Sequence, residues 1–313
     1  MKLVIIEPIG VEKERLLSLA AEALGGKIEI TYYDTKVTDT ETLIERGKDA
    51  DIIAVSNLPL NEDVINGCKN LKLLSVAFTG VDHIAMETCK KNGVMVCNCA
   101  GYSTAAVADL VFGMIITLYR NIIPCNKVIR EEGTKDGLIG FELEGKKFGV
   151  IGTGTIGMRV ANIARAFGCE VYAYSRTQKE VQGITYVDLD TLLSTCDIVS
   201  IHTPLNESTK GLIHGEKLAL MKKNAILINT ARGPIVDSKA LADALNSGKI
   251  AGAGIDVFEK EPPIEKDHPL FHTPNTVVAP HIGFATKEAL VKRAVIVFDN
   301  VVKWMENKPQ NVM

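Results

Sequence analysis

The stretch FGVIGTGTIG, residues 148–157, carries the strongest fold signal in the chain. A short apolar strand leads into three glycines spaced as GxGxxG, and a helical pattern follows as far as Phe167. This order of strand, glycine turn and helix is typical of a site for the pyrophosphate of a dinucleotide. Gly152 permits the tight turn, Gly154 lets the phosphate approach the backbone, and Gly157 lets helix and strand pack closely. A glycine-rich turn without a ligand is the alternative.

Apolar strands alternate with helical segments on both sides of this stretch. The chain up to residue 99 predicts a first series of strands, at 3–6, 28–32, 51–56, 73–78 and 94–97. The later part predicts a second series, at 148–151, 170–174, 198–202, 225–229, 252–256 and 276–279. Continuous Val- and Ile-rich strands with helical crossovers indicate doubly wound parallel sheets covered on both faces. Between the series, residues 103–119 predict a long apolar helix, either between domains or in a subunit interface, and a loop follows at 130–145.

Composition excludes several classes of protein. The chain has 313 residues, with 35 Lys and Arg against 38 Asp and Glu. It therefore lacks the excess of basic residues that would indicate nucleic acid or an anionic membrane as a partner. The longest apolar stretch, 105–118, contains Asp109 and is too short for a membrane span. Seven scattered cysteines indicate reduced thiols rather than disulfides or a metal site. We therefore expect a cytoplasmic protein that binds no metal.

Three reactive side chains follow strands of the second series. Arg232 comes after 225–229, Glu261 after 252–256 and His281 after 276–279. Ligands of open parallel sheets lie beyond the carboxyl ends of the strands, so we expect these three side chains to share one edge with the glycine turn. His202 also ends a strand and is a weaker candidate. Each residue alone has a structural alternative: an Arg bound to loop carbonyls, a Glu in a solvated turn, or a His satisfied within its loop.

Arg, Glu and His together suit one reaction. A guanidinium binds a planar carboxylate bidentately and polarises an adjacent carbonyl. An imidazolium donates a proton to that carbonyl oxygen as hydride reaches the carbon, and a neighbouring carboxylate orients the ring and favours its charged form. The set predicts reduction of a 2-oxo acid by a nicotinamide cofactor, or the reverse oxidation of a 2-hydroxy acid, with Arg232, Glu261 and His281 as the catalytic residues.

The residues after strand 170–174 predict which cofactor is bound. An acid there would accept hydrogen bonds from the adenosine ribose of NAD. Ser175, Arg176 and Thr177 stand there instead, and their hydroxyls and guanidinium would receive a 2′-phosphate. We therefore predict a preference for NADP(H), with NAD(H) as the alternative if Arg176 only stacks on adenine or lies in solvent.

The chain resembles the D-isomer-specific 2-hydroxyacid dehydrogenases over nearly its whole length. The matching stretches, in order, are GTGTIG, CDIVSIHTPLNESTKGLI, NTARGPIVD, GAGIDVFEKEPP and APHIGFAT. The resemblance implies two Rossmann-like domains with the active site in a cleft between them. It divides the chain into a flavodoxin-like substrate domain, residues 1–99 and 285–313, and a dinucleotide-binding domain, residues 100–284. Family members are usually dimers, so a homodimer is expected.

The resemblance also implies roles for individual residues. It gives Arg232 as substrate clamp, His281 as acid/base and Glu261 as its partner. Contacts to the cofactor are implied for Thr155 and Ile156 at the pyrophosphate, Thr203, Pro204 and Thr209 on the adenosine side, and Thr230, Ala231 and Asp256 at the nicotinamide. Substrate contacts are implied for Thr79 and Gly80 through their backbone, and for Tyr102.

Three positions depart from the family pattern. Ser175-Arg176 replaces the acid usual in members that use NAD, and Asp109 stands where Glu is usual, with little expected consequence. Phe284 replaces a small residue after HIG, and it either narrows the substrate pocket or packs. An alternative function is a dinucleotide-sensing binding protein, such as the corepressors that share this fold. The retained Arg, Glu and His favour the enzyme.

Overall fold

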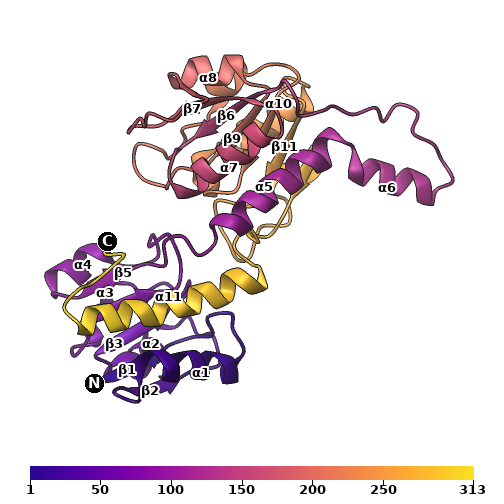
Figure 1. Cartoon of the computed structure of the whole chain (residues 1–313). Helices are drawn as coiled ribbons and strands as arrows, with labels where there is room; N and C mark the ends of the chain where they lie inside the picture. Colours follow the sequence, from indigo (N-terminus) through magenta and orange to yellow (C-terminus); the bar gives the residue numbers. More distant parts are fainter. The chain divides into compact units, whose positions relative to one another are not determined.

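The computed structural model describes all 313 residues and divides them into two α/β units (Figure 1). Unit 1 comprises Met1–Ser103 and Ala285–Met313, and unit 2 comprises Thr104–Phe284. The first boundary falls after Ser103 and not after residue 99. The reason is that Tyr102 is buried in unit 1, where its ring packs edge-on against Phe78 with the centroids 6.4 Å apart.

Unit 1 is built on a five-stranded sheet in which every strand pair is parallel. The strand order is β2-β1-β3-β4-β5, in which β1 lies between β2 and β3, as in flavodoxin-like sheets. The strands are β1 (Lys2–Ile5), β2 (Glu29–Tyr32), β3 (Ile52–Val55), β4 (Leu73–Val76) and β5 (Met95–Cys97). The helices are α1 (Lys13–Leu24), α2 (Thr40–Gly47), α3 (Glu62–Gly67), α4 (Met86–Lys91) and α11 (Lys287–Met305). α11 packs beside α1 and β4, so the end of the chain completes this unit.

Unit 2 contains a seven-stranded parallel sheet with the order β12-β11-β10-β9-β6-β7-β8. The strands are β6 (Lys147–Ile151), β7 (Glu170–Tyr174), β8 (Ile184–Tyr186), β9 (Ile198–Ile201), β10 (Ile226–Asn229), β11 (Gly252–Ile255) and β12 (Thr276–Val278). The helices are α5 (Thr104–Tyr119), α6 (Ile122–Arg130), α7 (Thr155–Ala166), α8 (Leu189–Thr195), α9 (Gly215–Leu220) and α10 (Ser238–Asn246), with 3₁₀ turns η1 (Gly233–Ile235) and η2 (Pro269–His272). The two parallel sheets confirm the predicted fold class.

Two buried clusters hold the sheet of unit 2 between helices. One contains α5 and α7 residues around Phe148, and the other contains residues of α8, α9 and α10 around Leu227. The central strands β6, β9 and β10 are buried along most of their length, as expected when helices cover both faces. This packing fixes the carboxyl edge of the sheet, where the strand-end loops project.

The apolar helix predicted at 103–119 is α5, and its buried residues Val111 and Ile115 pack into the core of unit 2. No single helix is long and apolar enough to cross a membrane, and only α5 and α6 together reach that length and composition, as a pair bent by 55°. All seven cysteines are free thiols, and six of them are buried.

Two short elements were not predicted from the sequence. β8 has three residues, none of them buried, so it lacks the apolar run that marks the other strands. α6 has nine residues, of which none is buried, and it contains Pro124 in its first turn. Both elements lie at an edge of unit 2, where few tertiary contacts shape the residue pattern.

Candidate active site

The glycine turn has the geometry that a bound phosphate requires. Gly152 has a φ of +96°, and a Cβ there would lie 2.7 Å from the carbonyl oxygen of His202. A Cβ at Gly157 would collide with the Gly152 carbonyl, whereas one at Gly154 would meet nothing within 4 Å. No side chain caps α7, so the N–H groups of its first turn face the open space above Gly154.

Two buried hydroxyls at this edge have no hydrogen-bond partner in the protein. They are the Oγ1 atoms of Thr153, which is 2% exposed, and of Thr230, which is 8% exposed. A buried hydroxyl without a partner is costly, so such atoms indicate the place of a polar ligand. Together with the open glycine turn, they fit a dinucleotide laid from the end of β6 to the end of β10.

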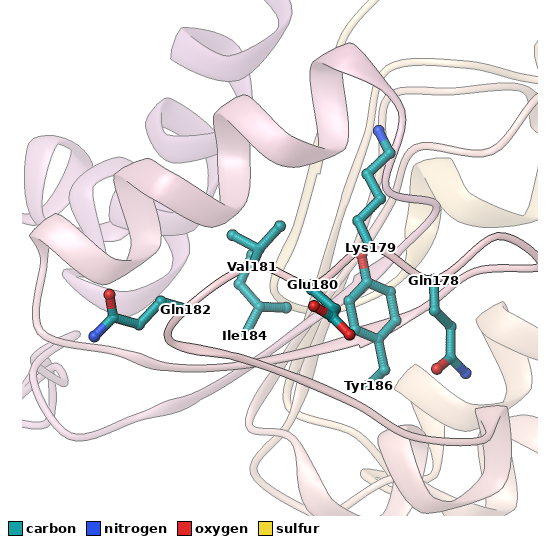
Figure 2. Close-up of a pocket in the computed structure, with 7 residues that line it drawn as sticks. All are labelled: Gln178, Lys179, Glu180, Val181, Gln182, Ile184 and Tyr186. Carbon is teal, nitrogen blue, oxygen red and sulfur yellow. The ribbon is translucent and has the colours of Figure 1, made fainter.

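The loop after β7 holds the residues predicted to select the cofactor. Arg176 and Thr177 are exposed there, and no acidic side chain replaces them. Lys179 extends from this loop, and its Nζ donates to the carbonyl oxygen of Thr153 in the glycine turn at 3.1 Å. Figure 2 shows Lys179 extending away from the other residues that line a cavity of about 650 Å³ beside β8, which are Gln178, Glu180, Val181, Gln182, Ile184 and Tyr186.

The loop after β9 is closed by its own side chains. The hydroxyl of Thr209 accepts from the N–H of Asn206 at 2.8 Å and donates to the carbonyl of Pro204 at 2.7 Å. Thr209 therefore shapes the turn that carries Thr203 and Pro204. His202 is not placed as an acid/base, because burial lowers its pKa to about 3 and its Nε2 lies 2.8 Å from the Ser200 hydroxyl.

Glu261 and His281 meet in unit 2, although 20 residues separate them in the chain. The Oε2 atom of Glu261 lies 2.9 Å from Nδ1 of His281, and Oε1 accepts from the N–H of Phe258 at 3.2 Å. Both side chains keep part of their surface exposed, 21% for Glu261 and 25% for His281. The carboxylate is thus fixed at both oxygens and holds one ring nitrogen, and the imidazole remains accessible.

Asp256 anchors the turn that carries His281. Its two carboxylate oxygens accept from the N–H groups of Ile282 and Gly283 at 2.8 and 2.7 Å, and its backbone carbonyl accepts from the N–H of His281 at 2.8 Å. These bonds hold His281 in the left-handed region, with a φ of +54°. Burial raises the pKa of Asp256, and the two N–H groups partly offset that effect. A strained backbone of this kind is typical of functional sites.

Arg232 begins the 3₁₀ turn after β10. The side chain of Asn229 shapes this turn, because it donates to the carbonyl of Arg232 at 2.9 Å and accepts from the N–H of Ala231 at 3.0 Å. The next residue, Gly233, packs so closely on the backbone of Phe258 that any Cβ would collide with it. The Arg232 turn therefore adjoins the segment Phe258–Glu261, and the structure brings all three predicted catalytic residues to one edge of unit 2.

The expected substrate residues Thr79 and Gly80 follow β4 in unit 1, and the Thr79 carbonyl accepts from the Asn98 side chain at 2.8 Å. Tyr102 is 3% exposed, with the Arg293 guanidinium 5.7 Å from its ring centroid. Sequence reasoning missed Glu7, whose buried Oε1 accepts from the N–H groups of residues 56–58 and fixes the loop after β3. The only sequence feature that points to Glu7 is its place as an acidic residue at the end of the apolar stretch 3–6.

Comparisons with known proteins identify the family of this chain. Residues 112–283 match the family described as D-isomer specific 2-hydroxyacid dehydrogenase, NAD binding domain. The chain is 35% identical to a hydroxypyruvate reductase of Blautia hydrogenotrophica, over 100% of this chain and 99% of the relative. It is 37% identical to a glyoxylate reductase of Thermococcus litoralis, over 90% of this chain and 89% of the relative.

Among solved structures, an acyclic imino acid reductase, Bsp5, in complex with NADPH and D-Arg superimposes with a TM-score of 0.91. The two chains are 31% identical, and the match covers 100% of each. The chain therefore belongs to the D-isomer-specific 2-hydroxyacid dehydrogenase family, and it is an NAD(P)-dependent oxidoreductase that interconverts 2-oxo acids and 2-hydroxy acids.

Proposed function

We propose that this protein reduces small 2-oxo acids to D-2-hydroxy acids, with Arg232, Glu261 and His281 as its catalytic residues and NADPH as its preferred cofactor. The contact of 2.9 Å between Glu261 and His281, on the edge that carries the glycine turn, is the observation on which the proposal rests. Relatives named hydroxypyruvate and glyoxylate reductases support a substrate of two or three carbons.

Each residue has a distinct task in this reaction. The Arg232 guanidinium binds the substrate carboxylate and polarises its carbonyl oxygen. Because Nδ1 of His281 faces Glu261, Nε2 is the atom that gives a proton to that oxygen. A reduced nicotinamide, when bound, would supply the hydride that the carbonyl carbon accepts. Glu261 stabilises the imidazolium before transfer, and in the reverse direction the neutral ring of His281 accepts the proton from the substrate hydroxyl.

The preference for NADPH follows from the loop after β7. Its three polar residues Ser175, Arg176 and Thr177 offer donors to a 2′-phosphate, and none of these three positions carries a carboxylate that would repel it. Lys179 lies on the same loop and reaches the glycine turn, so its ammonium adds positive charge beside that site. The adenosine side is assigned to Thr203 and Pro204.

Phe284 limits the size of the substrate in this proposal. Its ring stands edge-on to the imidazole of His281, with the centroids 5.7 Å apart and the planes at 78°. A bulky aromatic ring directly beside the acid/base favours glyoxylate and hydroxypyruvate over longer 2-oxo acids. Thr79, Gly80 and Tyr102 of unit 1 are proposed to contact the substrate on its carboxylate side.

We also propose that two copies associate through α6. Three isoleucines of this helix, Ile122, Ile123 and Ile129, are 45, 55 and 68% exposed, and none of its residues is buried. Apolar side chains on an amphipathic helix of this kind usually pack against a partner. Light scattering is expected to give a dimer for the protein and a monomer for I129E, whereas a monomeric wild type would contradict the assignment.

The function is tested with a substrate panel. Glyoxylate, hydroxypyruvate and pyruvate are offered with NADPH and with NADH, and pyruvate with ammonium adds the 2-imino acid, since an imino acid reductase is a structural neighbour. We expect the highest kcat/KM with glyoxylate or hydroxypyruvate and NADPH. Cofactor binding without turnover of any acid would instead indicate a dinucleotide-sensing protein.

The predicted preference for NADPH is tested with a substitution at Ser175. Ser175→Asp places a carboxylate where the 2′-phosphate would lie, and we expect it to shift the ratio of kcat/KM from NADPH toward NADH by at least about tenfold. Ser175→Ala is the matched control, because it removes the hydroxyl without adding charge. An unchanged ratio in Ser175→Asp would refute this reading of the loop.

A further inference from the structure

A second His–Glu pair lies on the loop that carries Glu261. Nε2 of His268 is 3.0 Å from Oε2 of Glu259. Nδ1 of the same ring accepts from the N–H of Leu270 at 3.4 Å, at the start of η2. Since Nδ1 is an acceptor, the ring proton lies on Nε2 and is donated to Glu259. Both nitrogens are therefore engaged, so this pair is not equipped to exchange protons with a substrate.

Aromatic rings enclose His268. Its ring lies edge-on to Phe258, with the centroids 5.0 Å apart at 85°, and it lies 5.4 Å from Phe271. Phe258 and Phe271 also contact each other at 5.6 Å. Only 12% of the histidine side chain is exposed. The imidazole thus joins η2 to Phe258 through packing as well as through hydrogen bonds.

Glu259 ties the same loop to α10. Burial opposes ionisation of Glu259, but hydrogen bonds from the side chains of Ser238 and His268 outweigh it and lower its pKa. Ser238 is the first residue of α10, so the carboxylate connects that helix to η2. The pair is therefore a bridge between two rigid elements on either side of the catalytic glutamate.

The bridge is connected to the proposed proton donor, His281, through Phe258 and Glu261. Phe258, held by the His268 ring, donates its N–H to Oε1 of Glu261, and Oε2 of Glu261 faces His281. Phe258 also supports the Arg232 turn, since Gly233 packs on its backbone. Displacing Phe258 would change the position of Glu261, and through it that of the imidazole.

We infer that His268 and Glu259 are positioning residues: they fix the segment Phe258–Glu261 so that Glu261 holds His281 in its reactive orientation. This inference rests on the proposed roles of Glu261 and His281. The pair borders a cavity of about 500 Å³, and the other charged residues around it are Lys210, Asp237, Lys239, Lys260 and Glu265. A shortened side chain at 268 leaves space that water can enter next to this cavity, so the fold is expected to survive the change.

The test compares His268→Ala, His268→Gln and the double variant His268→Ala/Glu261→Gln, with His272→Ala as control. His272 is an exposed histidine of the same η2 turn. We measure kcat and KM for glyoxylate, the pH profile of kcat, the NADPH dissociation constant by fluorescence, and the thermal midpoint. A small displacement at the reacting groups reduces kcat far more than binding, so we expect His268→Ala to lower kcat by about tenfold or more, with less than about twofold change in KM and in the dissociation constant.

Three further results are expected if the pair acts through Glu261. The alkaline limb of the kcat profile moves to lower pH in His268→Ala. His268→Gln regains most of the rate, because its amide can donate to Glu259. In the Glu261→Gln background, removing His268 causes little further loss, as residues acting as a unit are not additive. His272→Ala behaves like the wild type.

Other outcomes overturn the inference. A lower thermal midpoint with an unchanged kcat and pH profile in His268→Ala would show a purely structural role, and so would an equal, additive loss in the Glu261→Gln background. If His268→Ala does not fold, Glu259→Gln probes the pair from its other member, and an unchanged kcat profile there is equally contradictory. If Glu261→Gln alone leaves kcat unchanged, the proposed function itself fails, and the inference fails with it.

Discussion

The pairs Glu261–His281 and Glu259–His268 contain the same two residue types on neighbouring turns, at 2.9 and 3.0 Å. The difference lies in what surrounds each ring. His268 has an ordinary backbone, an aromatic enclosure and a backbone N–H on its second nitrogen. His281 has a left-handed backbone held by Asp256, and its side chain is 25% exposed, about twice the 12% of His268.

If His281 is the acid/base and His268 is not, as we propose, a His–Glu contact alone does not define an acid/base. The contact fixes a tautomer, and the environment of the other nitrogen decides whether a proton can leave. Variants of the two pairs should therefore differ in kind: those at 281 and 261 affect the chemistry, and those at 268 and 259 affect position and stability.

The largest contrast is expected between the two histidines. His281→Asn removes the proton donor, and we expect kcat for glyoxylate reduction to fall by about 10² to 10⁴, the range for a positioned acid/base. NADPH binding, followed by fluorescence, should be unchanged. A loss in His281→Asn no greater than that in His268→Ala would erase the distinction between the pairs.

Arg232→Lys tests the guanidinium that is proposed to bind the substrate. Arg232 stands on the turn that packs against Phe258, the residue that contacts both Glu261 and His268. A lysine keeps the charge but loses the planar, bidentate donors, so kcat should fall and KM for glyoxylate should rise. Hydrogen bonds to charged groups contribute about 1.5–3 kcal/mol, which corresponds to a loss of about 10- to 160-fold in kcat/KM. Steady-state kinetics that show only a KM change would place Arg232 in ground-state binding alone.

Glu261→Gln separates charge from hydrogen bonding in the reactive pair. The amide oxygen can still accept from Nδ1, but the negative charge beside the imidazolium is lost. We expect kcat at neutral pH to fall by about tenfold and the alkaline limb of the profile to move to lower pH. A pH profile identical to that of the wild type would mean that Glu261 does not act on His281 through its charge.

The smallest effect is expected for the stability of Glu259→Gln. Because the pKa of Glu259 is lowered in the folded protein, the folded state binds fewer protons than the unfolded state near pH 4, and ionisation stabilises the fold. That contribution is present above the unfolded value of about 4.3 and is lost as the pH falls through the folded value.

With the Glu259 side chain 39% exposed, solvent screening limits this contribution to less than about 1 kcal/mol. Urea unfolding should show Glu259→Gln less stable than the wild type at pH 7, with a difference that shrinks between pH 5 and pH 3. A difference that grows on acidification would have the wrong sign for this carboxylate.

The main features that local pattern controls were predicted from the sequence. The glycine spacing after residues 148–151 predicts the tight turn that the structure forms at Gly152, and the rule that parallel strands end at one edge predicts a common edge for Arg232, Glu261 and His281. Both predictions need only local sequence information: where a strand ends and which residues follow it.

Features set by contacts between distant residues were not predicted. The bonds from Asp256 to residues 282 and 283, and the contact of His268 with Glu259, depend on how the loops close, which no periodicity encodes. The short β8 and the exposed α6 were missed because neither has the buried pattern from which elements are recognised.

The role of His281 as proton donor is tested most directly by the pH dependence of kcat/KM for glyoxylate reduction with saturating NADPH, measured for the wild type and His281→Asn. If His281 is the proton donor, the wild-type rate falls tenfold per pH unit above a single ionisation and the residual rate of His281→Asn shows no such ionisation. The same ionisation in both proteins would show that the proton comes from another group.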